Sequence, residues 1–577
     1  MPKSVVVTSA LVLTLLATAG NPVFSRRWSP VYAKPQPALP AYAPGEIIVK
    51  LKESSLQATA DTVRIEAVDR AAVDLASRAG AIGAEPLFQR AWNERLGPIA
   101  RNHGLDSFIL LTVDPNQNIG PLIEKLKSDE SVEVAEPNYL VKPGLMIPND
   151  PGFFQQWPLL NFGFAVDGQP TTQGADIHAA DAWSITTGDP NVIVAVTDTG
   201  VDITHPDLAA NIYTNPGVVH DGYPGDLHGY DVADNSPDVT DVLGHGTEMS
   251  GIIGAVLNNN LGVSGMCQSK VLPVRFFKKT GPSPSDVQGS VADAAKAIVY
   301  SMVAGASIIN ASWTITVPDS DLPALKAAVQ ATSDAGILLV CIAGNEGLNN
   351  DSNVIYPNAY QLPNQIVVGA SDFNDELWHA PGLPQMINSG YGPATVQLCA
   401  PGVSVYTLQA RGPCFLCTTS TNPSDWYGSV TGTSAAAAFV SGVAALVKSK
   451  YPQDPGPLMR RRILESVDSK AALQGRVVTG GRLSALGALT IQLKITPPVV
   501  TKVKYKAGAQ KLMILGSDMQ QGATILIGST GYPTSPKGDL STLIAHVPDT
   551  AFPPGVTVTL VLQNPDGGTS QPITITR

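Results

Sequence analysis

Between about residues 150 and 490 the sequence alternates short apolar runs with helix-like stretches, and this pattern constrains the fold most strongly. Continuous apolar runs occur at 192–197, 271–277, 307–311, 337–343 and 365–370. Stretches such as 286–303 and 322–335, which lie between these runs, have helical periodicity. Strands that are apolar at successive positions are buried on both faces of a sheet. The pattern therefore predicts an α/β domain in which helices cover both faces of a parallel sheet.

Smaller regions with different patterns flank this domain, as expected for a chain of 577 residues. Residues 20–43 are rich in Pro and Ala and are interpreted as a linker. Residues 44–140 combine strand-like runs at 46–51 and 108–113 with helix-like segments near 70–80 and 119–127, which predicts a small α+β unit. From Pro497 onward helices give way to short β segments separated by turn residues, which predicts a small antiparallel sandwich over 497–577.

The N-terminus has the features of an export signal. Lys3 precedes an apolar run at 5–17, which ends at Ala17-Thr18-Ala19, a small-x-small cleavage pattern. We therefore predict a signal peptide over 1–19 and a secreted, extracellular protein, with an uncleaved signal anchor as the alternative. Later segments fall short of the roughly 20 apolar residues of a membrane span, so none is expected after signal removal. The net charge of -11 argues against a nucleic-acid partner.

The five cysteines divide into two groups. Cys341 and Cys399 lie in apolar runs and Cys267 precedes one, so free buried thiols are expected. Cys414 and Cys417 lie in a loop rich in Pro, Thr and Ser, where an exported protein could form a local disulfide. The sequence leaves that disulfide open. Zinc is not expected, because a single C-x-x-C is a weak signal.

Four segments place chemically useful side chains where strands end or helices begin, the edge at which α/β sheets gather functional groups. Asp198 ends an apolar run, His245 lies between two glycines, Ser434 precedes a helix-like stretch, and Asn345 follows another apolar run. Taken singly, Asp198 could cap a turn, His245 could lie in a tight turn, and Ser434 could be a plain N-cap, the commoner use of such a serine. Together they supply an orienting acid, a base, a nucleophile and an amide donor, which predicts nucleophilic catalysis.

The sequence around these residues resembles that of the subtilisin-like serine proteases, or subtilases. The resemblance covers about residues 150–489 and rests on four motifs: Asp198-Thr199-Gly200-Val201-Asp202, Gly244-His245-Gly246-Thr247, Ala343-Gly344-Asn345-Glu346-Gly347 and Gly432-Thr433-Ser434. It implies a subtilisin-like fold and a serine endopeptidase that acts on protein or peptide substrates.

The resemblance also implies a role for each matching residue. Asp198 would orient His245, which would take the proton from Ser434 as this serine attacks the scissile carbonyl. Asn345 and the Ser434 backbone N–H would hold the oxyanion. The residues implied in substrate binding are Ser312 and Gly344. The sequence departs from the family pattern at Glu248, where a His is usual, at Ala438, where a Pro is usual, and at Thr314, where a Gly is frequent.

The segment 257–263 resembles the calcium loop of the family. The residues implied as calcium ligands are Asp207, Leu257, Asn259, Leu261 and Val263, the leucines and the valine through their carbonyl oxygens. Oxygen ligands suit Ca²⁺, so a structural Ca²⁺ is expected. An ordinary Asn-rich turn is the alternative.

The flanking units also have family resemblances. Residues 44–140 resemble a subtilase propeptide, which implies an autoprocessed zymogen whose own propeptide is an intramolecular inhibitor, cut off between about Val141 and Asp150; a permanent N-terminal domain is the alternative. Residues 497–577 resemble an IPT/TIG immunoglobulin-like domain, with either a spacer or a surface-binding role. A monomer is expected. The competing functional hypothesis is a catalytically inactive exported binding protein that keeps the fold.

Overall fold

The structure is a computed structural model that describes residues 8–9, 42–56, 61–88, 96–115, 117–139, 145–283, 286–380, 387–493, 496–520, 522–528, 530–564 and 567–577. Most of the predicted signal peptide (1–19) and linker (20–43) lies outside the described residues, as do residues 140–144 in the predicted maturation region. Within the described part, β1 (Thr8–Ser9) pairs with β12 (Trp313–Thr314). The chain divides into two compact units, Pro22–Pro143 and the remainder, described separately below.

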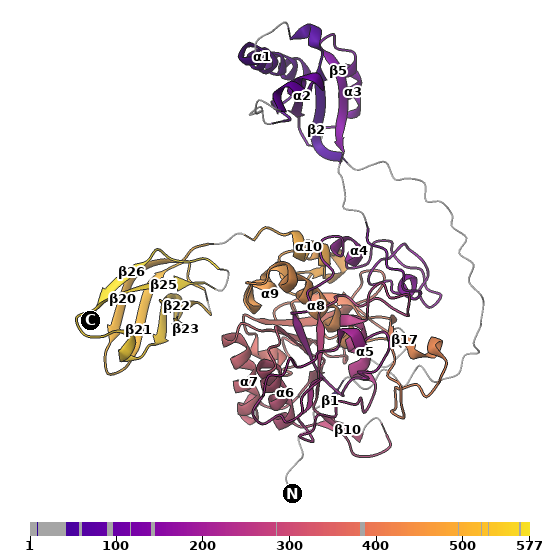
Figure 1. The fold of residues 1–577 in the computed structure, drawn as a ribbon, viewed down its shortest axis with the longest axis vertical. Coiled ribbons are helices and arrows are strands. Elements are labelled where there is room, and N and C mark those ends of the chain that lie inside the picture. The colour runs from indigo at the N-terminus through magenta and orange to yellow at the C-terminus, as the bar shows by residue number, and fades with distance from the viewer. Residues whose placement is uncertain are drawn as a thin grey trace. The chain divides into compact units, whose positions relative to one another are not determined.

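A nine-stranded sheet forms the centre of the larger unit (Figure 1). Its strands, in spatial order, are β18 (Asp468–Ser469), β19 (Gly481–Arg482), β15 (Leu398–Pro401), β14 (Gln365–Ser371), β13 (Leu338–Ile342), β11 (Ile308–Ala311), β6 (Ile193–Asp198), β8 (Lys270–Arg275) and β7 (Tyr230–Asp231). Neighbours are parallel except β18 and β19. From β6 the chain adds β7 and β8 on one side and β11 and later strands on the other. The carboxyl edge at such a switch point is where α/β sheets bind ligands.

Both faces of this sheet are buried, as predicted from the continuous apolar runs. Val194 and Val196 of β6 face one hydrophobic core, whereas Ala195 faces the other. The first core contains α5 (His245–Gly254), α8 (Thr433–Lys450), α9 (Gly456–Leu464) and α10 (Ala485–Thr490). The second contains α6 (Val291–Val303) and α7 (Pro323–Asp334), which lie side by side in Figure 1. Two separate cores explain why the strand sequences lack the polar alternation of a half-exposed sheet.

Two element boundaries differ from the sequence prediction. The predicted helix at 286–303 begins only at Val291, because Ser290 caps it by accepting from the Asp293 N–H, and the preceding residues form β10 (Val287–Gly289). The predicted strand at 271–277 is divided into β8 and β9 (Phe277–Lys279), and β9 pairs with β10. A hairpin edge with little hydrophobic periodicity accounts for both differences. Helix α8 runs unbroken through Ala438, where the family pattern has a Pro.

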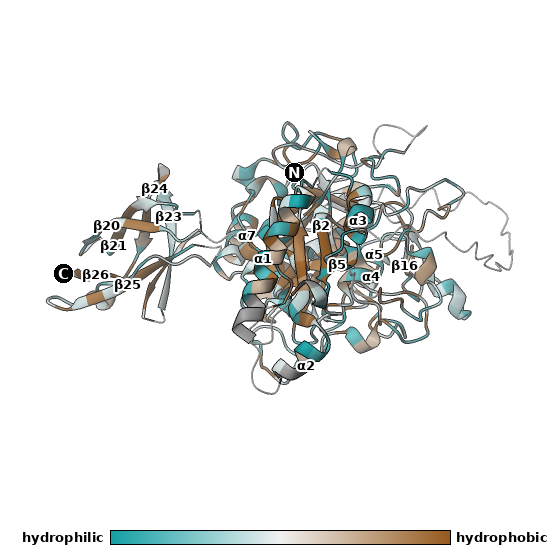
Figure 2. Ribbon diagram, turned by 90° about the horizontal axis from the view of Figure 1, so that it is seen from above, coloured by the Kyte–Doolittle hydropathy of each residue, from teal (hydrophilic) through white to brown (hydrophobic). Residues whose placement is uncertain are grey.

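The smaller unit is a four-stranded antiparallel sheet with helices. The strand order is β3 (Gly83–Pro86), β4 (Phe108–Thr112), β2 (Tyr42–Leu51) and β5 (Val132–Tyr139), and the helices are α1 (Asp61–Ala79), α2 (Leu96–Asn102) and α3 (Gly120–Lys127). Helix α1 carries both hydrophilic and hydrophobic colour (Figure 2), because Val68, Ala72 and Leu75 are buried in the core of this unit whereas Val73 is exposed. The described residues thus form the α+β unit that the sequence predicted.

The C-terminal region consists of antiparallel strands around its own hydrophobic core. The hydrogen-bonded order is β20 (Val499–Lys506), β21 (Lys511–Ser517), β24 (Asp539–His546), β23 (Thr530–Lys537), β22 (Thr524–Ile527), β25 (Thr557–Gln563) and β26 (Ile573–Thr576). Strand β23 pairs with β22 through its first half and with β24 through its second half, and so connects two groups of strands. Strands β23 and β26 were not predicted from the sequence, and neither contains a buried residue.

Candidate active site

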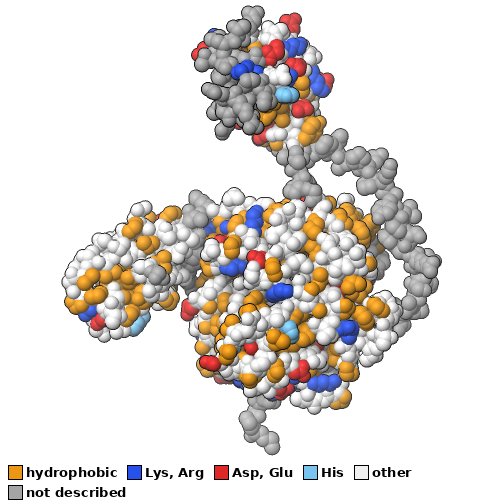
Figure 3. Space-filling view, in the orientation of Figure 1, with side chains coloured by type: hydrophobic (Ala, Val, Ile, Leu, Met, Phe, Trp, Pro, Cys, Tyr) orange, Lys and Arg blue, Asp and Glu red, His pale blue; other side chains and the backbone are white. Residues whose placement is uncertain are grey.

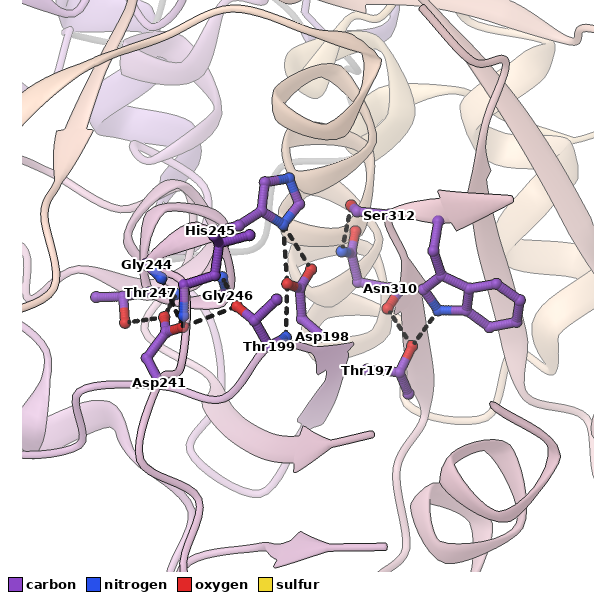
Figure 4. Close-up of polar contacts among 12 residues, drawn as sticks. Thr197, Asp198, Thr199, Asp241, Gly244, His245, Gly246, Thr247, Asn310 and Ser312 are labelled. Atoms are coloured by element: carbon purple, nitrogen blue, oxygen red, sulfur yellow. Dashed lines mark hydrogen bonds and ion pairs between the residues drawn. The ribbon is translucent and has the colours of Figure 1, made fainter. Parts of the chain in front are cut away.

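Asp198 and His245 contact each other at the carboxyl edge of the central sheet. Asp198 is the last residue of β6, and His245 is the first residue of α5. The Nδ1 atom of His245 lies 2.8 Å from Oδ1 and 3.0 Å from Oδ2 of Asp198, as the dashed lines in Figure 4 show. Asp198 also accepts a hydrogen bond of 2.7 Å from the Thr199 N–H. The carboxylate thereby fixes the orientation of the imidazole and leaves Nε2 free to act as a base.

The glycines around His245 allow this close approach. A Cβ atom on Gly246 would lie 2.0 Å from the Gly200 carbonyl oxygen and 3.2 Å from the Asp198 Cβ, so a larger residue would push α5 away from β6. Gly244 has a φ of +111°, in the left-handed region that favours glycine. These contacts explain physically why a Gly-His-Gly triplet marks the site.

Asp241 anchors the start of α5 and was not predicted from the sequence. Its Oδ1 accepts from the Gly244 N–H at 2.7 Å and from the Thr199 hydroxyl at 2.8 Å. Its Oδ2 accepts from the N–H and the hydroxyl of Thr247 at 2.9 and 2.7 Å (Figure 4). The available signal was an Asp shortly before a helix start, since such residues satisfy the free N–H groups there. Asp241 thus connects the segments that carry Asp198 and His245.

The electrostatic surroundings of His245 favour its protonated form. Burial by itself lowers the pKa of the imidazole, but the carboxyl groups of Asp198, Glu248 and Asp241 outweigh this effect and raise the pKa to about 9. The ring is therefore a stronger base than an exposed histidine.

Ser434 lies in the first turn of α8, where backbone N–H groups have no partner within the helix. It is buried, and its Oγ has no hydrogen-bond partner among the described residues. The structure therefore places Ser434 at a helix N-terminus, as predicted, but does not connect it to His245 by a hydrogen bond. An unpartnered buried hydroxyl costs free energy and is a group available for chemistry.

Asn345 is held in one orientation by the residue that precedes Ser434. Its Oδ1 accepts from both the backbone N–H and the hydroxyl of Thr433, each at 2.9 Å. With the amide oxygen engaged, Nδ2 is the atom left to donate. Asn345 follows β13 and is buried, so its donor is fixed in a region of low dielectric.

The two predicted substrate-binding residues lie after neighbouring strands. Ser312 follows β11, and its hydroxyl accepts a hydrogen bond of 2.9 Å from Asn310 Nδ2. Asn310 also accepts from Ser441 of α8 at 2.8 Å, which ties this strand to the Ser434 helix. Gly344 has a φ of +86°, and a Cβ there would lie 2.6 Å from Glu346 Oε2. A side chain at Gly344 would therefore be both strained and crowded.

Three of the five predicted calcium residues, Asp207, Asn259 and Val263, are brought together, and Val263 takes part through its N–H rather than through the predicted carbonyl oxygen. Asp207 accepts from Asn259 Nδ2 at 2.7 Å and from the Val263 N–H at 2.9 Å. Asp150, which the sequence analysis used only as a domain boundary, accepts from the N–H groups of Asn258 and Asn259 at 3.0 and 2.9 Å. Burial, with a smaller contribution from the nearby Asp150, raises the pKa of the Asp207 carboxyl to about 7.

The donor set therefore fits a divalent cation. Asp150 and Asp207 are buried and Asn259 is half-buried, and the groups around Asp207 are neutral or acidic. A buried carboxylate normally has a cationic partner, and oxygen ligands are those that Ca²⁺ prefers. Among the described residues no group of three or more His, Cys, Asp or Glu side chains forms a metal site of another kind.

The cysteines occupy the two environments expected. Cys267, Cys341 and Cys399 are free and buried, and burial raises the pKa of the Cys267 thiol to about 11. Cys414 and Cys417 form a disulfide. Leu416, between them, packs on Gly244, and its N–H donates to the Leu243 carbonyl at 2.8 Å. The disulfide loop therefore contacts the segment that carries His245.

Comparison with known proteins gives the family. A family model described as the subtilase family matches residues 189–487, which contain Asp198, His245, Asn345 and Ser434. The chain belongs to the subtilase family. It is 31% identical over 374 residues to the thermophilic serine proteinase of Bacillus sp. (strain AK1), covering 65% of this chain and 76% of that protein.

A second relative of this subtilase is thermitase from Thermoactinomyces vulgaris, 32% identical over 314 residues, or 54% of this chain and 93% of thermitase. Among solved structures, a protease from Pseudoalteromonas arctica PAMC 21717 aligns with a TM-score of 0.46 at 26% identity, over 59% of this chain and 98% of that chain. The family and the named serine proteinases make this subtilase a serine endopeptidase with a subtilisin-like α/β fold.

Proposed function

We propose that this subtilase is a secreted endopeptidase in which Asp198, His245 and Ser434 form the catalytic triad and Asn345 completes the oxyanion hole. The observation that carries the proposal is the contact of His245 Nδ1 with both oxygens of Asp198 at the carboxyl edge of the sheet. The anchored Asn345 amide and the buried, unpartnered Ser434 hydroxyl support it.

In the proposed reaction, His245 Nε2 takes the hydroxyl proton of Ser434 as Oγ attacks the scissile carbonyl carbon. The negative charge on the carbonyl oxygen is stabilised by Asn345 Nδ2 and the Ser434 backbone N–H. The protonated imidazole then donates to the leaving amine, which gives an acyl-enzyme. His245 next activates a water molecule, whose attack releases the acid product and regenerates the Ser434 hydroxyl. Ser312 and Gly344 contact the substrate on the acyl side.

Replacement of Ser434 tests this assignment. We expect Ser434→Ala to abolish casein hydrolysis and to leave the precursor unprocessed. A fluorophosphonate should label the wild-type protein and not the variant, because only a triad-activated serine reacts. Wild-type activity in Ser434→Ala contradicts the assignment, and a folded wild-type protein that resists labelling supports the inactive binding protein instead.

The proposal includes a structural calcium ion. Asp207, Asn259 and the carbonyls of Leu257, Leu261 and Val263 would bind it, and the position of Asp150 adds a carboxylate to this set. When bound, the ion would supply positive charge to the buried carboxyl groups of Asp207 and Asp150. The residues of this chain then tie the loop to the start of the catalytic domain, since Ser264 Oγ donates to Asp150 at 2.7 Å. A melting temperature that does not change across a chelator titration removes this part of the proposal.

The two flanking regions are proposed to have roles other than catalysis. The unit at 44–140 would inhibit the enzyme and be cut off between about Val141 and Asp150, with Asp150 already bound to the catalytic domain through Asn258 and Asn259. N-terminal sequencing of the mature protein tests this site. The strands at 497–577 would form an IPT/TIG-like spacer or surface-binding module, and a chain truncated before Pro497 should then retain peptide hydrolysis.

Protein or peptide substrates are the expected partners, and the enzyme is proposed to be a monomer. Among the described residues no helix is long and apolar enough to cross a membrane. On the face shown in Figure 3, the described Lys and Arg side chains are scattered among uncharged and acidic ones and form no basic strip for phosphate groups.

A further inference from the structure

Glu248 is a buried carboxyl group beside the proposed triad that the mechanism above does not use. It lies in the first turn of α5 and is 5% exposed. Its Oε2 has no hydrogen-bond partner among the described residues; the contact from Thr407, at 3.0 Å, is to its backbone carbonyl. A carboxyl group in this state is strongly destabilising unless another group compensates for the lost water. A neighbouring group must therefore compensate for the water that the Glu248 carboxyl loses on burial.

The helix geometry directs Glu248 toward His245. Residues three apart lie on the same face of an α-helix, and each Cα–Cβ bond tilts toward the helix N-terminus. The Glu248 Cα–Cβ bond consequently tilts toward the turn that begins at His245. The charged groups that act on it are the His245 ring, of opposite sign, and the carboxylates of Asp241 and Asp198, of like sign.

The other elements packed against α5 supply no cation that is free to pair with Glu248. These elements are α8, β16 (Val405–Leu408), β6 and β8. Their titratable side chains other than Asp198 are Tyr406 of β16, Lys270 and Arg275 of β8, and Lys448 and Lys450 of α8. Each of these cations is bound elsewhere: Lys270 to the Ala210 carbonyl, Arg275 to Asp231 and Asp234, Lys448 to the Asp454 carbonyl and Lys450 to the Leu489 carbonyl. Within the described part of the chain, His245 is thus the source of positive charge at Glu248.

We propose that Glu248 is a positioning residue, a second carboxylate that helps Asp198 to stabilise the His245 imidazolium formed when Ser434 loses its proton. This inference rests on the proposed function. Asp198 acts through hydrogen bonds to Nδ1, whereas Glu248 acts through its charge in a region of low dielectric.

The coupling between the two residues is reciprocal. Burial, with Asp241 and Asp198, raises the pKa of Glu248 to about 8, and the imidazolium opposes this rise. Glu248 in turn contributes to the raised pKa of His245. Each residue therefore favours the charged form of the other.

The test is the pH dependence of kcat/KM in Glu248→Gln, which keeps the shape of the side chain and removes its charge. Loss of a negative charge lowers the pKa of His245, so a larger fraction of the base is neutral at low pH. We expect the acid limb of the profile to move to lower pH by about one unit. At a pH below the limb, kcat/KM relative to its plateau should then be about tenfold higher than in the wild type. The matched control is Glu465→Gln, because Glu465 is exposed and pairs with Arg461; its acid limb should not move.

An acid limb that stays in place in an active Glu248→Gln enzyme overturns the proposal, because Glu248 is then a neutral buried acid. If this variant does not fold, NMR titration of the Ser434→Ala chain decides instead. Coupled titration of the Glu248 carboxyl and the His245 ring supports the proposal. A Glu248 carboxyl signal that does not change as His245 titrates overturns it. Failure of the proposed function has a different signature, namely a wild-type serine that does not react with the fluorophosphonate.

Discussion

Replacement of Asn345 by Ala should separate transition-state stabilisation from substrate binding in this enzyme. The wild-type amide oxygen accepts two hydrogen bonds of 2.9 Å from Thr433, which leaves Nδ2 as the free donor. This geometry exists before substrate arrives, so the donor needs no reorganisation when the oxyanion forms. The alanine side chain has no donor, and the developing charge is then held by the Ser434 N–H alone.

The expected loss follows from one missing donor. For enzymes of the subtilisin type, removing such a donor costs about 3–4 kcal/mol of transition-state stabilisation. At about 1.4 kcal/mol per tenfold change, kcat should fall by about 10²–10³. Because the interaction forms only in the transition state, kcat and kcat/KM should fall together and KM should stay near its wild-type value. Steady-state hydrolysis of a chromogenic peptide measures all three constants.

Thr433→Val is the matched control. It removes the hydroxyl donor to Asn345 but keeps the backbone N–H donor, so the amide remains in place with a weaker anchor. One lost hydrogen bond of about 1 kcal/mol corresponds to a roughly fivefold lower kcat. The oxyanion role is refuted if the Asn345→Ala enzyme keeps a kcat within tenfold of the wild-type value. It is also refuted if only KM changes.

Three further predictions concern protonation and stability. Neutral imidazole is the active base, and burial lowers the pKa of His245 less than the carboxylates around it raise it, to about 9; activity should therefore rise with pH, and a flat profile from about pH 5 to 8 contradicts this. Burial raises the pKa of Asp207 from 3.8 to about 7. Without calcium, the contribution of the protonated carboxyl to the free energy of unfolding is therefore complete below pH 3.8 and is lost as the pH rises through 7. Chelation should consequently lower the melting temperature more at alkaline than at acidic pH, and equal shifts in calorimetry argue against calcium at this carboxyl. Arg482→Met removes ion pairs of 2.5 Å to Asp375 and 2.6 Å to Asp468; we expect a loss of about 3 kcal/mol in the free energy of unfolding, and a loss under 1 kcal/mol in urea titration shows that the network contributes little.

Local sequence patterns predicted much of the fold because each pattern reports a local property. The apolar runs at 192–197 and 337–343 correspond to β6 and β13, whose residues alternate between the two cores. The same reasoning failed at 286–290, where a short hairpin strand and the Ser290 cap precede α6. Edge strands have weak periodicity, and β26, at one edge of the C-terminal region, was missed for the same reason.

The candidate site was only partly visible in the sequence. Motif residues such as Asp198 and Asn345 stood out because polar side chains end apolar runs. Asp241 and Asp150 carried no such signal, because each acts through backbone N–H groups of segments that fold onto it. Glu248 was noted as a departure from the family pattern, but its burial beside three charged residues depends on how α5 packs.

The sequence by itself predicted the layered α/β fold class, the chain order of the candidate acid, base and nucleophile, and the family. Tertiary structure decided which of these groups contact one another. His245 and Asp198 are 47 residues apart, and Thr433 and Asn345 are 88 apart. Periodicity covers a few residues, whereas these contacts depend on parallel pairing of β6 with β11 and of β11 with β13. Only that pairing brings the strand ends to one edge, where β6, the loop after β13 and the first turns of α5 and α8 supply the proposed active site.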